Sequence, residues 1–524
     1  MANENSFVRF VRNEKPNNKG GRVRPIRKTQ TSVKVETANT QLATTAAEIA
    51  LRLHGAGTGT VSAINGESGE ELVINPYLNR EALKQNGKDE FSVPFSNVGR
   101  LSGLTISSWD STLRPEQYLK SAEITHFGRT YRTIVDEYTY PLALLWNSAT
   151  PPVLTENIEV VYVTANASGE LIIPGIVSNV KLFGETEGIQ TVIKNAHITV
   201  SNPGNVKLTI KNLSITAPAQ KTGDGISAIK YADDATGTLT LCLNNAALTG
   251  GDIGPNPAAN SNSAGNGIRM IGGNTVIYPI NGVTVTGGAN LNTTDKTGNS
   301  VGIYGQNITI DGNMTILPGK ASINQVGLSL SDGLLTIKKN RQVKMTSTRE
   351  LGASGLRVNE KARAIIEPGA ILTTVGRGGV WLANSSAADG AVLCVQGTLD
   401  SSGSSCFNSY EGQCVVDFQH PDATLVLQTG SVREGLKISK SFDTANAYRF
   451  VGTGSVSVTS ENTMSIAVSA SGWTLKLEPV SGQAQGVRGI QKEIIVTEIR
   501  NEIERDKTKD LKDLANEKLG QIRK

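Results

Sequence analysis

The chain of 524 residues has few aromatic residues, at 5%, and few charged ones, at 19%. No apolar run reaches the roughly 18 to 20 residues that a bilayer-spanning helix needs. The first thirty residues also lack the apolar core of a secretory signal. We therefore expect no membrane insertion, and a protein that is made in a cytoplasm and leaves it, if at all, by another route.

Motifs of the common enzyme classes are missing as well. The chain has no GxSxG, no Walker phosphate loop, and no GxGxxG between a strand and a helix. The four histidines do not have the spacing of an HExxH metal site. They are His54, His126, His197 and His420. The four cysteines lack CxxC spacing, and we interpret them as core residues. They are Cys242, Cys394, Cys406 and Cys414. We expect no metal, no cofactor and no catalytic residue that can be named from a motif.

Glycine and strand-forming residues are abundant instead, with 55 Gly and long tracts of Thr, Ser, Asn, Val and Ile. From Glu156 to about Val480, short alternating runs are separated by Gly, Asn and Asp. A unit that opens with Gly and an aliphatic residue recurs at spacings of 42, 35, 25, 28 and 24, starting at Gly225, Gly267, Gly302, Gly327, Gly355 and Gly379. Such a period is typical of a coil of three short strands.

One such coil cannot bury its inward Val, Ile and Leu side chains, whereas stacked coils bury them continuously. We therefore predict a mainly β protein whose residues 153–480 form a right-handed parallel β-helix, or β-solenoid, with its clearest repeats from Gly225 to about Thr429. A β-sandwich is the rival fold, but it does not explain the repeat. Val451–Leu477 is interpreted as terminal turns or a cap.

The N-terminal part has a different composition. Residues 1–45 carry nine Lys or Arg against three Glu and are predicted to be a flexible basic arm, which could bind an acidic protein surface or, less favoured, nucleic acid. Apolar residues in Thr37–Leu53 recur at helical spacing and predict a short helix. Residues 46–152 hold seven of the fifteen Trp and Tyr residues, and this concentration predicts a small, mainly β domain.

The C-terminal part, residues 489–524, has no aromatic residue, no Pro, and charge at many positions. An apolar and lysine stripe with steps of three and four residues runs through Ile499, Ile503, Lys507, Leu511, Leu514, Lys518 and Ile522. It predicts a helix that buries this stripe in a coiled coil, in which the chain associates with itself. Docking of the helix on its own solenoid is the alternative.

Catalysis by paired carboxylates remains possible on a solenoid, because stacked coils bring distant acids together. The candidates are Asp224, Asp233, Asp234, Asp252, Asp311, Asp332, Glu360, Glu367, Asp389, Asp400, Glu411 and Asp417, and most of them have the surroundings of turn residues. Aromatic platforms for sugars could come from Tyr231, Tyr278, Tyr304, Trp381, Phe407, Tyr410 and Trp473. Among these, Trp381 could stack on Phe407 or Tyr410 from the next coil.

This order of parts, with a basic arm, a small domain, a solenoid from Glu156 and a helix at residues 489–524, resembles bacteriophage fibre and tailspike proteins. The resemblance lies in architecture and not in a diagnostic motif. It implies attachment to other virion proteins through residues 1–152, a solenoid that meets a host-surface glycan or receptor, a homotrimer, and a location in the virion after assembly in the host cytoplasm.

Three hypotheses follow from the resemblance. The first is a structural head or tail fibre without enzymatic activity. The second is a tailspike depolymerase, a glycosidase or lyase that cleaves host polysaccharide. The third is a bacterial surface adhesin, which the absence of a signal disfavours. Few aromatic residues and no clustered acid–aromatic motif disfavour the second, so the first is preferred.

Overall fold

A computed structural model describes most of the chain. The described residues are 31–37, 49–55, 71–74, 87–93, 101–108, 119–133, 140–221, 224–254, 263–291, 299–321, 324–347, 353–383, 390–403, 405–409, 414–428, 431–432, 437–452, 457–458, 463–465 and 473–480. They are mainly β, and they fall into two compact units, Met1–Leu328 and Ser329–Lys524. Among them, no helix is long and apolar enough to cross a membrane.

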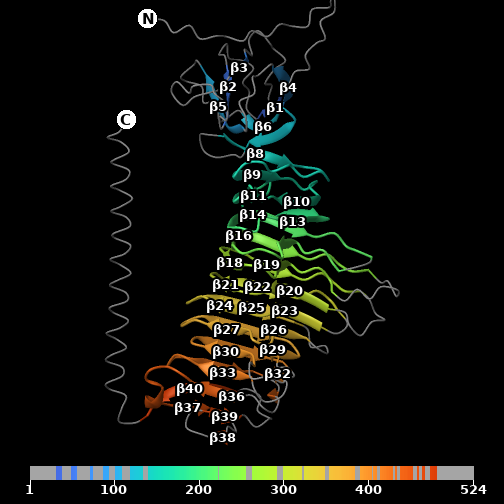
Figure 1. Cartoon of the computed structure of the whole chain (residues 1–524). Coiled ribbons are helices and arrows are strands. Elements are labelled where there is room, and N and C mark those ends of the chain that lie inside the picture. Colours follow the sequence, from blue (N-terminus) through green and yellow to red (C-terminus); the bar gives the residue numbers. More distant parts are fainter. Residues whose placement is uncertain are drawn as a thin grey trace, which may run out of the picture. The chain divides into compact units, whose positions relative to one another are not determined.

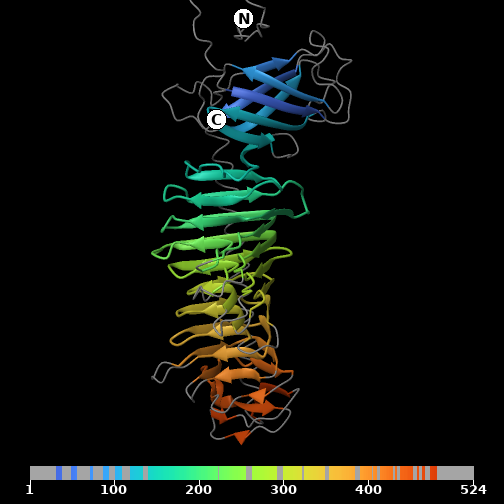
Figure 2. The same ribbon diagram turned by 90° about the vertical axis from the view of Figure 1, so that its right-hand side faces the viewer.

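Unit 1 begins with an antiparallel domain (Figures 1 and 2). One sheet has the strand order β4-β1-β6-β7-β8, and a second has the order β3-β2-β5-β8. The strands are β1 (Thr31–Thr37), β2 (Ile49–Gly55), β3 (Glu71–Ile74), β4 (Lys88–Val93), β5 (Leu101–Ser108), β6 (Leu119–His126), β7 (Arg129–Thr133) and β8 (Tyr140–Trp146). Alternate side chains such as Val33, Val35 and Ile124 are buried, which gives the domain its own core.

Two expectations for this region are wrong. Thr31–Thr37, placed by the sequence in the basic arm, form β1, which pairs with both β4 and β6. Ile49–Gly55, placed partly in a short helix, form β2. The helical spacing of a few apolar residues was a weaker signal than strand pairing, because packing against neighbouring strands overrides local periodicity.

The rest of unit 1 is built from coils of up to three strands, whose parallel ladders are consistent with a β-solenoid. First strands are β9 (Ile158–Val163), β11 (Asn179–Phe183), β18 (Asn274–Pro279) and β21 (Ile308–Ile310). Second strands are β12 (Thr191–Lys194), β19 (Thr284–Thr286) and β22 (Met314–Leu317), whereas β14 (Val206–Thr216) and β16 (Thr238–Thr249) bend to serve as both first and second strands. Third strands are β10 (Gly169–Ile173), β13 (Ala196–Val200), β15 (Ile229–Tyr231), β17 (Ile268–Met270) and β20 (Asn299–Gly305), and β23 (Asn324–Leu330) lies at the unit boundary.

The register of the parallel ladders places aliphatic side chains of successive coils on top of one another. Val180 pairs with Leu208, Leu208 with Leu241, and Leu241 with Ile277, and all four side chains are fully buried. Burial of each such side chain contributes about 1.5–3 kcal/mol relative to exposure. A strand therefore gains a core only from the coils before and after it.

Unit 2 repeats this plan in coils of regular length. Its first strands are β24 (Leu334–Ile337), β27 (Arg363–Ile366), β30 (Val392–Val395), β33 (Val415–Phe418) and β36 (Lys437–Lys440). Its second strands are β25 (Gln342–Thr346), β28 (Ile371–Val375), β31 (Thr398–Ser402) and β34 (Thr424–Leu427). Its third strands are β26 (Ser354–Val358), β29 (Gly378–Leu382), β32 (Ser405–Ser409) and β35 (Ser431–Val432).

Antiparallel strands end the stack in unit 2. The 3-10 turn η2 (Ala445–Ala447) precedes β37 (Tyr448–Gly452), β38 (Ser457–Val458), β39 (Thr463–Ser465) and β40 (Trp473–Pro479). Strand β40 pairs with β34 and β37, and β39 pairs with β36 and β38. These strands occupy edges that a further parallel coil could otherwise extend, in agreement with the cap expected over Val451–Leu477.

The recurring glycines are required by close packing at the third strand. A Cβ on Gly267 would lie 2.4 Å from Cγ1 of Val285, and one on Gly355 would lie 2.5 Å from the carbonyl oxygen of Met345. Real side chains do not tolerate such distances, so only glycine fits where the third strand passes the second. At these glycines the repeat in the sequence thus marks a steric contact between a third strand and a second strand of the same or the next coil.

Asparagines form the corner between first and second strands. Asn212 and Asn245 have positive φ, 55° and 49°, in the middle of β14 and β16. The Asn245 Nδ2 donates to the Asn212 Oδ1 at 3.0 Å. Asparagine tolerates this left-handed conformation better than most residues, and its amide joins adjacent coils.

Unit 1 also joins its antiparallel domain firmly to its first coil. Strand β8 pairs in parallel with β9. Arg129, next to the β6–β7 turn, donates to Glu159 Oε1, to Thr155 Oγ1 and to the carbonyl oxygen of Val153, each at 3.1 Å. Glu159 is fully buried, and its Oε1 also accepts from the backbone N–H groups of Thr155 and Glu156.

Two parts of the expected fold are not tested. The coiled-coil helix at residues 489–524 lies outside the described residues. The right-handed path of the coils stays a prediction.

Substitution at the Asn245 corner tests the stacking of coils. Asn245→Ala loses the hydrogen bond and keeps an unfavourable positive φ, so it should lower the free energy of unfolding by about 2 kcal/mol. Asn245→Gly retains the backbone conformation and should cost about half as much. Asn244→Ala is the control: its side chain is half-buried and accepts only a 3.5 Å hydrogen bond from the Asn281 Nδ2, so its loss should cost less than about 1 kcal/mol. Denaturant titration measures the free energy of unfolding of all three variants. Equal costs for Asn245→Ala and Asn244→Ala would contradict the stabilising role of the asparagine corner.

Candidate functional site

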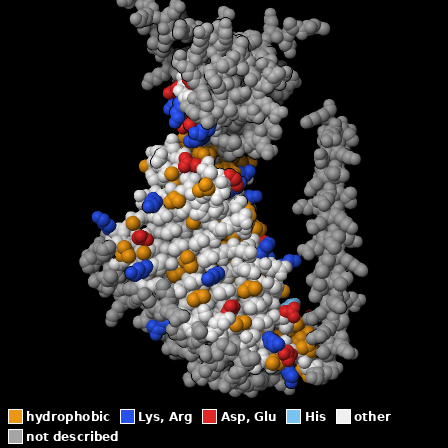
Figure 3. Space-filling model, turned by 180° about the vertical axis from the view of Figure 1, so that it is seen from behind, with side chains coloured by type: hydrophobic (Ala, Val, Ile, Leu, Met, Phe, Trp, Pro, Cys, Tyr) orange, Lys and Arg blue, Asp and Glu red, His pale blue; other side chains and the backbone are white. Residues whose placement is uncertain are grey.

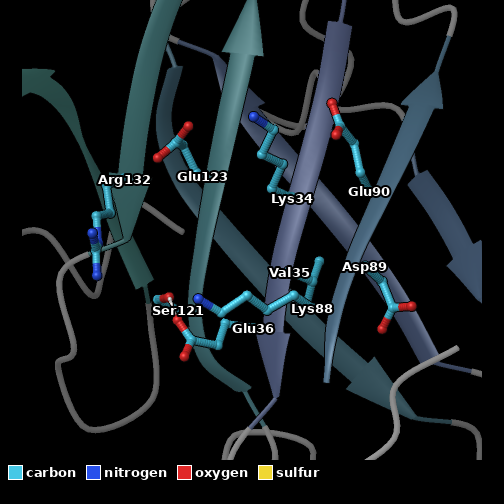
Figure 4. Close-up of a pocket in the computed structure, with 9 residues that line it drawn as sticks. All are labelled: Lys34, Val35, Glu36, Lys88, Asp89, Glu90, Ser121, Glu123 and Arg132. Carbon is cyan, nitrogen blue, oxygen red and sulfur yellow. Dashed lines mark hydrogen bonds between the residues drawn. The ribbon is translucent and has the colours of Figure 1, made fainter. Parts of the chain in front are cut away.

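The outer face of the N-terminal sheet carries a shallow groove of about 330 Å³. Seven of its nine lining residues are charged, and the lining comprises Lys34, Val35, Glu36, Lys88, Asp89, Glu90, Ser121, Glu123 and Arg132. They come from β1, β4, β6 and β7 (Figure 4). The groove is open, and its lining includes neither His nor Cys.

Strand register sets an alternating charge pattern in this groove. Lys34 on β1, between β4 and β6, lies opposite Glu90 of β4 and Glu123 of β6. Two residues further, Glu36 lies opposite Lys88, whose side chain points toward it in Figure 4. Opposite charges in cross-strand positions stabilise a sheet by tenths of a kcal/mol, and they also present a defined pattern to a partner.

Glu36 is the best-connected carboxylate of the groove. The Lys120 Nζ lies 2.8 Å from its Oε1, and the Ser121 Oγ donates to its Oε2 at 3.5 Å. The hydrogen bond from Lys120, together with the charges of Lys88 and Arg132, lowers the pKa of Glu36. The groove thus holds fixed charges of both signs near neutral pH, which suits recognition of a charged partner surface and not proton transfer.

A second polar surface lies on the outer side of the third strands of unit 1. Glu170 of β10 accepts a hydrogen bond from the Thr199 Oγ1 at 2.7 Å, and its Oε1 lies 3.6 Å from the His197 Nε2. His197 is 14% exposed. Burial lowers the pKa of His197 more than the neighbouring Glu170 raises it.

On the next third strands of the stack, one carboxylate lies close to two cations. The Asp233 Oδ2 lies 3.5 Å from the Lys230 Nζ and 3.9 Å from an Arg269 guanidinium nitrogen. The Arg269 guanidinium lies 5.8 Å from the ring centroid of Tyr304 on the next coil. Unit 2 has a similar pair, with the guanidinium of Arg357 5.1 Å from the Trp381 ring centroid.

Several of the sequence-predicted carboxylates are held by cations or backbone amides. Glu367 contacts the Lys338 Nζ at 2.6 Å, and the Asp252 Oδ1 accepts from the backbone of Ala289. Asp400 lies in β31, and Asp389 and Glu411 lie outside the described residues. Apart from Asp417, the remaining candidates lie in or beside turns and bends between strands. They are Asp224, Asp233, Asp234, Asp311, Asp332 and Glu360.

Asp417 is the carboxylate with the most unusual surroundings. It lies in β33, is 8% exposed, and accepts hydrogen bonds from Gln419, Ser439 and Ser441. In register with it on the preceding coil is Cys394, whose Sγ lies 2.9 Å from the Arg363 Nε. The donors Gln419, Ser439 and Ser441 hold Asp417 in place, which is the pattern of a structural carboxylate.

Cys394 and Cys414 are buried, as expected of core residues, whereas the core assignment of Cys242 is wrong, because it lies at a partly exposed position of β16. His126 is buried, with its Nδ1 2.7 Å from the Thr31 Oγ1, and His420 Nδ1 accepts from the backbone of Asp422. Burial raises the pKa of Cys394 and of Cys414. Within the described ranges, no group of three His, Cys, Asp or Glu residues is placed to hold a metal ion.

The expected aromatic stack is wrong for one pair. Phe407 is in register with Val380, so Trp381 lies beside Asn408 instead. Tyr410 falls outside the described residues, and the side chains of Phe407 and Trp473 are not described. Tyr231 is buried, and its hydroxyl donates to the carbonyl oxygen of Gly204.

The remaining aromatic candidates face outward. Tyr278 is 39% exposed on β18, and Tyr304 and Trp381 are partly exposed beside arginines. Figure 3 shows that charged side chains on one face of the coils are scattered among uncharged ones. No family model, curated protein or solved structure matches the chain.

Protonation of His197 should destabilise unit 1. The folded-state pKa of His197 is lowered, so the unfolded chain takes up this proton first and stability falls as pH drops below about 6.5. His197→Gln removes this contribution and should flatten the decrease in melting temperature between pH 7.5 and 5.5. Identical pH profiles for the variant and the wild-type chain would contradict this assignment.

Proposed function

We propose that the protein is a structural fibre of a bacteriophage virion, attached to other virion proteins through its N-terminal region and exposing its coils to the host surface. The observation that supports this most is the firm junction within unit 1 between an antiparallel domain and a stack of parallel coils. The β8–β9 pairing and the ion pair between Arg129 and the buried Glu159 make that junction.

A junction of this kind suits a protein that must carry load between an attachment point and a surface. Glu159 is fully buried, so loss of Arg129 would leave a buried carboxylate without its cation, which is costly and favours the joined arrangement. The coils are then a right-handed solenoid that acts as a spacer with a large outer surface. The homotrimer that the resemblance implies, joined by the coiled coil expected at residues 489–524, belongs to this proposal.

The charged groove of the N-terminal sheet supports attachment through this region. Its pattern of fixed opposite charges offers specificity without a deep pocket, because a partner with the reverse pattern is favoured and others are repelled. Attachment through the basic residues before β1 would add to it. Host-surface adhesion is assigned to the outer faces of the coils, where polar and aromatic side chains are exposed.

Charge reversal in the groove tests the attachment. Lys34→Glu places a third carboxylate between Glu90 and Glu123, and we expect at least a tenfold loss of the chain from purified particles. Lys194→Glu, on an exposed position of β12, is the matched control and should be incorporated normally. Quantitative immunoblots of particles measure incorporation, and thermal melting of each purified chain verifies folding.

Three results would contradict the proposal. Absence of the wild-type chain from particles would refute a virion role, and normal incorporation of Lys34→Glu would refute the role of the groove. Steady release of reducing sugar ends from host polysaccharide by the purified chain would favour the depolymerase alternative.

A further inference from the structure

The outer side of the third strands in unit 1 forms a continuous polar strip. In register, Ile172 pairs with Thr199, Thr199 with Lys230, Lys230 with Arg269, and Arg269 with Tyr304. Adjacent strands are about 4.8 Å apart, so these five positions span about 19 Å along the stack. We call this surface the third-strand strip.

The strip has no excess of positive charge. Lys230 and Arg269 are accompanied by Asp233 between them and by Glu170 toward the first coils, and His197 beside Glu170 is neutral at pH 7 because burial lowers its pKa. The neighbouring turn residue Asp234 adds a further negative charge. A polyanion such as nucleic acid requires an excess of positive charge, which the strip does not offer.

Donors and acceptors alternate along the strip. The Lys230 ammonium and the Arg269 guanidinium only donate, the Asp233 and Glu170 carboxylates only accept, and the Thr199 hydroxyl does both. A ligand that matches such a surface must itself donate and accept at many points. Sugar hydroxyls have this property, whereas the centres of protein interfaces are depleted of charged groups.

Apolar surface is present at both ends. Ile172 is 49% exposed, and the ring of Tyr304 is partly exposed with the Arg269 guanidinium above it. The C–H faces of pyranose rings pack on such surfaces, and aromatic rings are favoured for this contact because they combine area with a polar edge. Hydroxyl-binding groups between two apolar ends suit a short stretch of a sugar chain.

We propose that the third-strand strip binds an uncharged, hydroxyl-rich polysaccharide that runs along the stack of coils from Ile172 to Tyr304. This inference rests on the proposed role in host-surface adhesion, and it adds the ligand class and the residues. Arg269 is held by Asp233 on one side and the Tyr304 ring on the other, so its donors are oriented before the ligand arrives.

Binding of the full chain to an array of bacterial surface polysaccharides tests this proposal. We expect binding to one or more uncharged polysaccharides that changes less than twofold between 0.05 M and 0.5 M salt, because no counterions are released. Tyr304→Leu should weaken binding about fivefold to tenfold through loss of the ring face. Asp233→Asn, at an exposed turn position, should weaken it similarly without affecting folding.

Tyr278→Leu is the matched control, because Tyr278 is exposed on a first strand of the same unit. It should bind as the wild-type chain does. Failure to bind any polysaccharide, unchanged binding by both strip variants, or binding to heparin or oligo(dT) that salt abolishes would each overturn the proposal. A chain found in particles that binds no polysaccharide refutes the strip alone, and a chain that binds but is absent from particles refutes the fibre role alone.

Discussion

The parallel backbone ladder between successive coils is the interaction on which the rest of the structure depends. Strands β14 and β16 pair over ten positions, and their inward Leu and Ile side chains stack in register. A single coil has neither hydrogen-bond partners for its strands nor a buried core, and it obtains both from its neighbours. Two requirements follow from this arrangement. The first and last coils need strands outside the repeat to pair with, and the backbone must turn in the same way at the corners of successive coils.

Both requirements are met by specific residues. Strand β8 and the Arg129–Glu159 pair close the first coil of unit 1, and antiparallel strands β39 and β40 cover the last strands of unit 2. Asn212 and Asn245 turn the backbone at one corner, and glycines such as Gly267 allow close approach at another. Because inward positions are occupied by this architecture, recognition is confined to outward side chains, as in the groove of the N-terminal sheet and the third-strand strip.

Much of the coil could be predicted from the sequence, because the spacing of glycines such as Gly267, Gly302 and Gly355 reflects a steric contact that recurs along the stack. The location of β1 could not be predicted, since its partners β4 and β6 lie more than 50 residues away. The Asp417 cluster escaped notice for a related reason. Its partners Ser439 and Ser441 are one coil further along the chain, 22 and 24 residues away. A search one coil length after each acidic position would have found them. The pairing of Trp381 with Phe407 was wrong by one residue, and a shift of one residue places a side chain on the opposite face of the sheet.

Amide hydrogen exchange of the full chain tests the central claim most directly, because it reports the hydrogen bonds of each strand. If coils stabilise one another, the amides of inner strands such as β14 and β16 in unit 1, and β27 and β30 in unit 2, should exchange slowest. Protection should decrease toward the turns between strands. Exchange of β14 and β16 amides as fast as that of the turn residues around Asp233 would contradict a stack held together by its parallel ladders.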